Sequence, residues 1–204
     1  MTSHSTGDPL KPPVRYPKRK VNIDCGDYVL RTIVPADATE RWARWMEDVE
    51  ASEMLNAPRK AMTMDELVTY IGSFDQRTKI LIGIFEKKSG LLLGFLRNDV
   101  NFETRQFLVA MIIGEPDYRN SGVTMAVTVP FRDYFFGELG MEAMLATALA
   151  HNKPIIHYLH ATGWTLDRTV PNAVKAHSGE GSFDLCYFSQ TAEGWRAWKK
   201  AKGK

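Results

Sequence analysis

The segment QFLVAMIIGEPDYRNSGVT, residues 106–124, passes from an apolar run through a polar loop into a second apolar stretch. The run 106–113 is rich in β-forming residues and predicts a strand. Pro116 and Asn120 break regular structure in the loop that follows, and a helix is expected over 122–136. The loop therefore presents backbone N–H groups at the positive end of a helix dipole, an arrangement that suits a phosphate or pyrophosphate group.

Two residues of this loop strengthen the case for an anion site. Gly122 lets the backbone approach a phosphate closely, and Arg119 adds a positive charge nearby. An ordinary strand-to-helix turn with a glycine near its N-cap explains the same pattern equally well. The segment alone leaves both interpretations open.

Upstream of this segment, the pattern predicts an antiparallel meander that is entered through two helices. Strands are expected over 28–34, 80–86 and 91–100, and helices from Pro35 onward and over 64–74. Trp42 and Trp45 recur at helical spacing in the first helix. The residues Lys-Lys-Ser-Gly at 87–90 form a hairpin turn between two of the strands.

Downstream of the segment, strands alternate with helices. Strands are expected over 141–149, 164–168 and 183–188, helices over 153–161 and 194–200, and a loop over 169–182. Such alternation predicts parallel neighbours joined by crossovers. The predicted fold class is therefore α/β, an α+β mixed sheet with mostly antiparallel N-terminal strands and helices on both faces.

Composition and charge are those of an ordinary globular chain. The 204 residues are 44% apolar and 25% charged, and a chain of this length builds one domain with a sizeable core. Residues 1–24 are expected to form a flexible, basic, Pro-containing arm, and residues 25–204 a single domain. The net charge of +2 argues against nucleic acid as a main partner. The basic residues near both ends keep an RNA-associated protein as an alternative.

Cysteines and apolar runs bear on compartment and metals. Cys25 and Cys186 lie far apart, so neither a disulfide framework nor a zinc cluster is expected. The N-terminus lacks the apolar stretch of a signal peptide, and runs such as 107–113 are too short to cross a bilayer. We therefore expect a cytoplasmic protein without a membrane partner. His157 and His160 have the spacing of a metal pair but no further ligand, so no metal is expected.

Short motifs in this chain resemble the GNAT superfamily of N-acyltransferases. Arg119-x-x-Gly122-x-Thr124 resembles the acyl-CoA loop of that superfamily, written Q/R-x-x-G-x-G/A. Asn152, followed by Gly163-Trp164, resembles a segment in which an Asn begins a helix and a Gly-aromatic pair begins the next strand. The motifs occur in the right order, and the resemblance extends over residues 27–199.

The two ends of the chain resemble one branch, the ribosomal-protein N-terminal acetyltransferases. That likeness lies in Leu30-Arg31, Pro35-x-Asp37 and the closing strand Asp184-x-x-Tyr187-Phe188. The resemblance implies a GNAT-type fold whose parallel fourth and fifth strands, 106–113 and 141–149, splay around acetyl-CoA or another acyl-CoA. It also implies direct transfer of the acyl group, with acetyl expected, to a primary amine in a ternary complex. The expected acceptor is a protein N-terminus or a small molecule. A homodimer is a possible assembly.

The resemblance also implies which residues bind acyl-CoA. They are Met111, Ile112, Ile113, Arg119, Asn120, Ser121, Gly122, Val123, Thr124 and Asn152. Thr124 stands where Gly or Ala is usual, and Asn120-Ser121 replaces a common Gly-Lys pair. Leu159 stands where many relatives have a tyrosine that protonates the leaving thiolate. These departures keep a degenerate protein, which binds CoA without efficient transfer, as the alternative function.

The general base is harder to assign. The strand 106–113 contains no acid, so it lacks the glutamate that some relatives use. His151 directly precedes Asn152 at the expected end of the fifth strand, and an imidazole suits proton pickup near neutrality. His151 is therefore the candidate catalytic residue, and a solvated histidine in a turn is the other interpretation.

Overall fold

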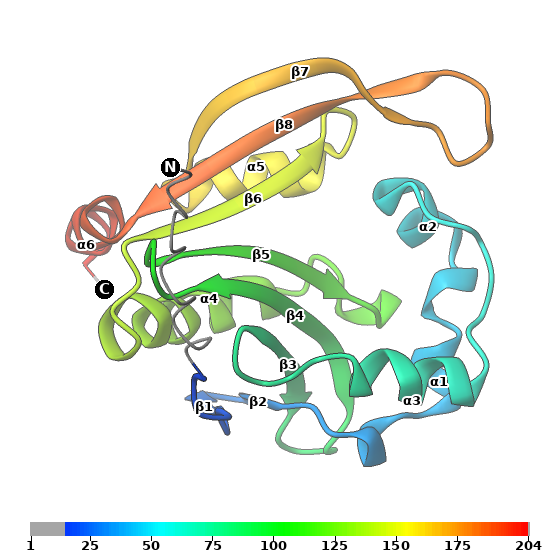
Figure 1. Ribbon diagram of the computed structural model, residues 1–204, viewed down its shortest axis with the longest axis horizontal. Coiled ribbons are helices and arrows are strands. Elements are labelled where there is room, and N and C mark those ends of the chain that lie inside the picture. Colours follow the sequence, from blue (N-terminus) through cyan, green and yellow to red (C-terminus); the bar gives the residue numbers. More distant parts are fainter. Residues whose placement is uncertain (1–14, 204) are drawn as a thin grey trace, which may run out of the picture.

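A sheet of eight strands, in the order β1-β2-β3-β4-β5-β6-β8-β7, organises the chain, with helices on both of its faces (Figure 1). The computed structural model describes residues 15–203. The strands are β1 (Asn22–Cys25), β2 (Tyr28–Thr32), β3 (Lys79–Glu86), β4 (Leu92–Asn101), β5 (Gln106–Ile113), β6 (Ala143–Leu149), β7 (Thr165–Lys175) and β8 (Ser182–Thr191). Neighbours are antiparallel except β5 and β6, which run parallel. The predicted mixed α/β fold class is confirmed.

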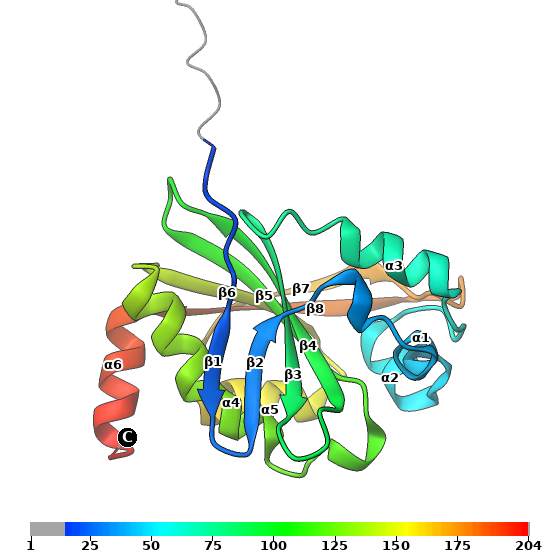
Figure 2. The ribbon, with the colours of Figure 1, turned by 90° about the horizontal axis from the view of Figure 1, so that it is seen from below.

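The helices gather in two places. They are α1 (Glu40–Ala43), α2 (Val49–Leu55), α3 (Met64–Gly72), α4 (Val123–Asp133), α5 (Lys153–Ala161) and α6 (Ala192–Ala201). Helix α4 packs against β1 and β2, whereas α1, α2 and α3 cluster at the other end of the molecule (Figure 2). Strand β1 begins at Asn22, inside the range 1–24 expected as an arm, and residues 1–14 and 204 lie outside the described residues.

The segment 35–55, expected to be helical from Pro35 onward, is instead a series of short turns. The Thr39 side chain accepts a hydrogen bond from the Trp42 backbone N–H at 3.2 Å, and Asp48 accepts one from Ala51 at 2.8 Å. Each capping residue has extended backbone dihedrals, so each one interrupts the helix and starts the next turn.

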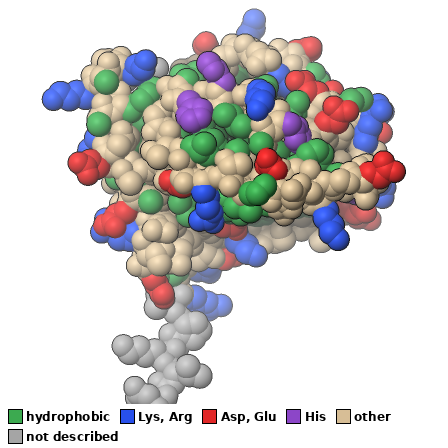
Figure 3. All heavy atoms as spheres, turned by 90° about the horizontal axis from the view of Figure 1, so that it is seen from above, with side chains coloured by type: hydrophobic (Ala, Val, Ile, Leu, Met, Phe, Trp, Pro, Cys, Tyr) green, Lys and Arg blue, Asp and Glu red, His purple; other side chains and the backbone are tan. Residues whose placement is uncertain are grey.

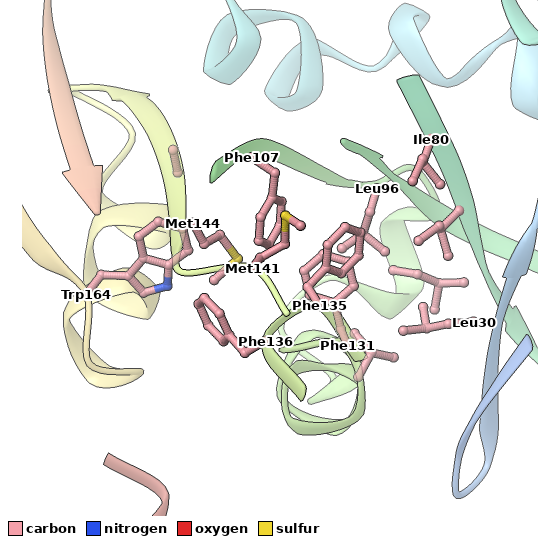
Figure 4. Packing of buried hydrophobic residues seen from close by; sticks show 14 of the residues in the cluster. Leu30, Ile80, Leu96, Phe107, Phe131, Phe135, Phe136, Met141, Met144 and Trp164 are labelled. Carbon is pink, nitrogen blue, oxygen red and sulfur yellow. The ribbon is translucent and has the colours of Figure 1, made fainter. Parts of the chain in front are cut away.

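Successive residues of β3 enter two separate cores. Ile80, Ile82 and Ile84 belong to a large cluster that includes residues of α4, α5 and α6. Leu81 and Phe85 belong to a smaller cluster beside α1 and α3. Figure 4 shows part of the large cluster, in which aromatic rings of β5 and of the turn after α4 stack on one another. Both faces of the sheet are therefore covered, which explains the continuous apolar run of β3.

Strands β5 and β6 pair only at their beginnings. The register consists of three pairs, from Gln106↔Ala143 to Leu108↔Leu145. Beyond that point β5 continues along β4 to Ile113, and β6 continues along β8 to Leu149. The two strands thus diverge, and a gap opens between their carboxyl ends.

The last part of the sheet differs from the prediction. Strand β7 extends to Lys175, so most of the loop expected over 169–182 is strand. It pairs with β8 at the edge of the sheet rather than with β6, and β5–β6 is the one parallel pair among the described strands. Nearly every side chain of β7 is exposed, and Pro171 and Asn172, which are typical of loops, explain why the sequence pattern ended the strand at 168.

Candidate active site

Two adjoining cavities lie at the carboxyl end of β5, and the first of them occupies the gap between β5 and β6. We call the first, about 610 Å³, the splay cavity, because residues of both diverging strands line it. We call the second, about 530 Å³, the loop cavity, because it is lined by Arg119, Asn120, Gly122, Thr124 and Met125. Met111 and Ile112 of β5, together with Asn152 and Tyr158, line both. A ligand that enters over the loop can therefore reach the diverging strands.

The loop ends at Gly122, which caps α4 with φ = +92°, in the left-handed region that favours glycine. The first amides of this helix, those of Val123, Thr124 and Met125, have no intrahelical acceptors. No side chain of the described residues caps them, so they remain available to a ligand. A Cβ placed on Gly122 would meet no atom within 4 Å. Gly122 and Thr124 line the loop cavity, so an open and positively polarised helix end faces it.

Arg119 also lines the loop cavity, but carboxylates already neutralise its charge. Its Nη1 lies 2.6 Å from Asp48 Oδ1 and 3.1 Å from Glu50 Oε2. Its Nε and Nη2 donate to the carbonyl oxygens of Ile113 and Gly114. The guanidinium thus fixes α2 to the end of β5, and anion binding at this loop depends mainly on backbone N–H groups.

The remaining predicted site residues divide between the cavity, the exposed surface and the protein interior. Ile113 and Asn120 line the loop cavity. Ser121 lines neither cavity, because its hydroxyl donates to the Tyr118 carbonyl oxygen at 2.7 Å. The Val123 side chain is buried in the large core. Of these last two residues, Ser121 is exposed, whereas Val123 offers only its backbone to a ligand.

Asn152 connects the start of α5 to α2 on the opposite side of the opening. Its Oδ1 accepts a hydrogen bond from Ile155 N at 3.3 Å and so caps α5, while its Nδ2 donates to the Met54 carbonyl oxygen at 3.2 Å. Next to Met54, Asn56 Nδ2 donates to the Lys175 carbonyl oxygen at 2.8 Å. Helix α2 therefore bridges the opening, from β5 to the start of α5 and the β7–β8 hairpin.

His151 does not reach either cavity. Its ring packs against Phe183 with centroids 4.5 Å apart, and its Nε2 lies 3.4 Å from the Glu53 carbonyl oxygen. Neither set of cavity-lining residues includes it. The geometry does not support the general-base role expected for His151, since side-chain packing holds the imidazole away from the gap between the strands.

Tyr158, which is one residue before the position at which relatives carry tyrosine, lines both cavities. Its hydroxyl lies 2.7 Å from Thr128 Oγ1 and 3.3 Å from Arg132 Nη2. Leu159, at the position where relatives carry tyrosine, is instead buried in the core. The spacing of Ile155 and Tyr158, three residues apart on α5, was the available signal, because such residues share one helix face.

Arg132 is buried behind Tyr158 without a carboxylate partner. The side chain is 1% exposed, and it forms no ion pair with any acid of residues 15–203. It donates to the Thr162 carbonyl oxygen at 2.7 Å and to Thr162 Oγ1 at 2.9 Å. Burial lowers the pKa of the Arg132 guanidinium from its usual value, since desolvation disfavours the charged form. An unbalanced positive charge therefore borders the splay cavity.

Other kinds of site are not found in the described part of the chain. Within residues 15–203, no helix has the length and apolarity needed to span a bilayer, and His, Cys, Asp and Glu side chains form no group of three suited to a metal ion. Cys25 and Cys186 are both free and buried.

A parallel strand pair that diverges beside an open helix end is the arrangement implied by the resemblance to acyl-CoA-dependent N-acyltransferases. A family model, the acetyltransferase (GNAT) domain, matches residues 28–165. The chain therefore belongs to the GNAT acetyltransferase family. No curated protein matches the chain.

Solved structures share this fold at low sequence identity. A GCN5-related N-acetyltransferase from Brucella melitensis has a TM-score of 0.75 at 15% identity, covering 91% of this chain and 86% of that one. The ribosomal-protein-S5-alanine acetyltransferase from Vibrio fischeri has a TM-score of 0.72 at 15% identity, covering 86% and 98%. The spermidine N-acetyltransferase from Vibrio cholerae, solved with CoA and spermine, has a TM-score of 0.73 at 13% identity, covering 83% and 98%. At these identities the likeness extends to the fold alone.

Proposed function

We propose that the protein transfers an acyl group from acyl-CoA to a primary amine by direct attack in a ternary complex. The observation that carries this proposal is the continuity of two cavities, which lead from the uncapped end of α4 into the gap between β5 and β6. Membership of the GNAT acetyltransferase family supports it. The finer assignment to the ribosomal-protein N-terminal acetyltransferase branch is part of this proposal.

The loop and strand residues bind the co-substrate in this proposal. The pyrophosphate accepts hydrogen bonds from the amides that follow Gly122. The pantetheine arm lies along Met111, Ile112 and Ile113, where β5 has no strand partner on the side of β6. A backbone N–H of this free edge stabilises the negative charge that develops on the thioester oxygen. Holding amine and thioester together in the gap contributes to the rate.

We assign to Tyr158 the role of proton donor to the leaving thiolate, for which Leu159 is unsuited. Attack by the amine forms the amide C–N bond and breaks the C–S bond, and the leaving thiolate takes a proton from the Tyr158 hydroxyl. Arg132 Nη2, at 3.3 Å, stabilises the negative charge left on the phenol oxygen. No carboxylate or imidazole is among the described residues that line the splay cavity, so the amine loses its proton to water.

The side of the splay cavity formed by α2, α3 and β4 receives the acceptor. Tyr70, Phe95 and Arg97 line this side. Arg97 forms an ion pair with Asp99 at 3.8 Å, and none of the described residues that line the splay cavity is a carboxylate. The cavity therefore offers no acid to a polycation, so a polyamine such as spermidine is a poorer acceptor than a protein N-terminus or a small monoamine. An amine panel that includes spermidine, an N-terminal peptide and monoamines tests this order.

Turnover separates the proposal from its alternative, a CoA-binding protein without efficient transfer. The alternative is favoured by Thr124, by the buried Leu159 and by Arg119, whose charge is neutralised by carboxylates. The test combines calorimetric titration of acetyl-CoA with detection of free thiol in the presence of the amine panel. Binding with amine-dependent thiol release supports the transferase, and binding without release supports the alternative.

A homodimer in the cytoplasm belongs to the same proposal. The outer edge of β7 has no strand partner among the described residues, and its side chains are mostly exposed. On the face seen from above in Figure 3, apolar side chains gather toward the middle and most charged side chains lie toward the margin. Sedimentation of wild type against Leu166→Lys, an exposed residue of β7, tests whether this edge joins two copies.

A further inference from the structure

Two hydrogen-bond donors border the splay cavity, the guanidinium of Arg132 and the indole N–H of Trp164. Each lacks some or all of its hydrogen-bond acceptors. Arg132 supplies the cation, and three of its hydrogen bonds go to Thr162 and Tyr158. A guanidinium has five N–H groups, so two of them have no partner among residues 15–203. Desolvating a charge without a counter-ion is unfavourable, which makes this position suited to an anion.

Trp164 provides the independent second observation. Its indole is 6% exposed, and Nε1 has no hydrogen-bond partner among the described residues. Arg132 Cζ lies 5.5 Å from the centre of the Trp164 ring, and both residues line the splay cavity. Figure 4 shows the indole beside Met144, within the apolar packing. A buried donor of this kind needs an acceptor atom, which its apolar neighbours do not supply.

We propose that the splay cavity takes an acyl group whose far end is a carboxylate, as in the CoA half-thioester of a short dicarboxylic acid. This inference rests on the proposed acyl-CoA function and names its donor class. A carboxylate offers two acceptor oxygens and one negative charge, which match the free N–H groups of Arg132 and Trp164. A methyl end offers neither, and a hydroxyl end brings no charge.

The position of Arg132 assigns the carboxylate to the donor and not to the amine. Arg132 and Gly122 belong to the same helix, and nine residues at 1.5 Å per residue place Arg132 about 13.5 Å along α4 from Val123. A pantetheine arm that starts at the helix end and follows Met111 and Ile112, which line both cavities, approaches Arg132 in the splay cavity. The amine enters from the side of Tyr70 and Arg97. The carboxylate is unchanged in the reaction, which breaks the C–S bond, forms the amide bond and returns a proton to sulfur.

The direct test compares succinyl-CoA with butyryl-CoA. Both acyl chains have four carbons and differ in a terminal carboxylate against a methyl group. We expect the unmodified protein to bind succinyl-CoA at least tenfold more tightly in calorimetry. Equal affinities, or a preference for butyryl-CoA, overturn the inference while leaving the acyl-CoA site intact. Absence of binding by acetyl-, butyryl- and succinyl-CoA alike overturns the proposed function as well.

Variants test which residues cause the preference for succinyl-CoA over butyryl-CoA. Trp164→Phe removes the indole N–H and keeps a smaller aromatic ring, and Arg132→Met removes the charge; both are expected to reduce the succinyl-to-butyryl affinity ratio several-fold. Arg97→Met removes a charge from the acceptor side of the same cavity and is expected to leave the ratio unchanged. The unmodified protein and Trp164→Phe keep the test decisive if Arg132→Met fails to fold. An unchanged ratio in Trp164→Phe, or a collapse in Arg97→Met, contradicts the assignment.

Discussion

The Tyr158 hydroxyl lies 2.7 Å from the Thr128 hydroxyl, which joins α5 to α4 at the wall of the splay cavity. Thr128 has a single hydroxyl proton, and it donates this proton to the Thr124 carbonyl oxygen at 2.7 Å. Tyr158 is therefore the donor in its bond to Thr128, while it accepts from Arg132. The phenol proton is held beside the cavity and can pass to a better acceptor, such as a thiolate, when one arrives.

We predict that Tyr158→Phe lowers kcat, because the leaving thiolate loses its proton donor. General acid catalysis contributes about 10²- to 10⁴-fold, so a loss in this range is expected. Affinity for acyl-CoA should change little, since the ring remains. Steady-state kinetics with saturating amine, together with calorimetric affinity for CoA, measures both quantities.

The matched control for this variant is His151→Ala. His151 lies outside both cavities, so near-normal turnover and an unchanged pH profile are expected. Normal turnover in Tyr158→Phe would remove tyrosine from the mechanism. A large loss in His151→Ala, with loss of the acidic limb of the pH profile, would restore histidine as the base.

We predict that Gly122→Ala weakens CoA binding about tenfold, which corresponds to about 1.4 kcal/mol. The added Cβ would occupy the space over the end of α4, where the pyrophosphate is expected. It would also strain the backbone, because φ is +92°. Gly179→Ala controls for this strain, since Gly179 has φ = +86°, has open space around it and lines neither cavity. Equal CoA affinity of the two variants would place the phosphate elsewhere.

Thr124 tests whether the loop is degenerate. Its side chain lines the loop cavity, and we predict that Thr124→Ala binds CoA as tightly as wild type or up to several-fold more tightly, because it restores the small residue that relatives have. Titration of CoA into both proteins decides the matter. A strong loss of affinity would mean that the Thr124 hydroxyl binds the phosphate, which also argues against a degenerate site.

Asp48 makes stability depend on pH. A hydrogen bond from Ala51 N and the ion pair with Arg119 hold the pKa of the Asp48 carboxyl below its ordinary value. A carboxyl with a lowered folded-state pKa stabilises the fold above its unfolded pKa, about 3.9. That contribution is lost as the pH falls through the folded-state pKa.

We therefore expect Asp48→Ala to lower the free energy of unfolding by about 1 kcal/mol at neutral pH. The difference from wild type should shrink in acid, below the unfolded pKa of about 3.9. Urea unfolding at neutral and acidic pH measures it. Glu50→Ala is the control, because this more exposed partner of Arg119 should contribute roughly 0–1 kcal/mol. If Asp48→Ala lowers the free energy of unfolding equally at both pH values, the charge of Asp48 does not contribute to stability.

Elements with a strong local pattern were predictable from the sequence. The run 106–113 and the helix 153–161 match β5 and α5 residue for residue, because apolar spacing and the Asn152 cap act within a few residues. The series of turns over 35–55 was not predictable, since Thr39 and Asp48 interrupt an otherwise helical spacing.

The open helix end at Gly122 was predicted from the sequence. The partners of the side chains in the same loop were not. Arg119 pairs with Asp48, a residue 71 positions away, and no local pattern reports that contact. Tyr158 lies one residue from the position expected for the tyrosine, about 100° around the helix, and its contacts with Thr128 and Arg132 of another helix leave no local pattern. Such contacts arise only when α4 and α5 pack on the same side of the sheet.

The measurement that tests the central claim most directly is amine-dependent release of free CoA from acetyl-CoA and succinyl-CoA, with mass spectrometry of the acylated amine. The account predicts CoA release that requires the amine, equals the amide formed, and falls strongly in Tyr158→Phe. Tight binding of both thioesters without amide product across N-terminal peptides and small amines would contradict it.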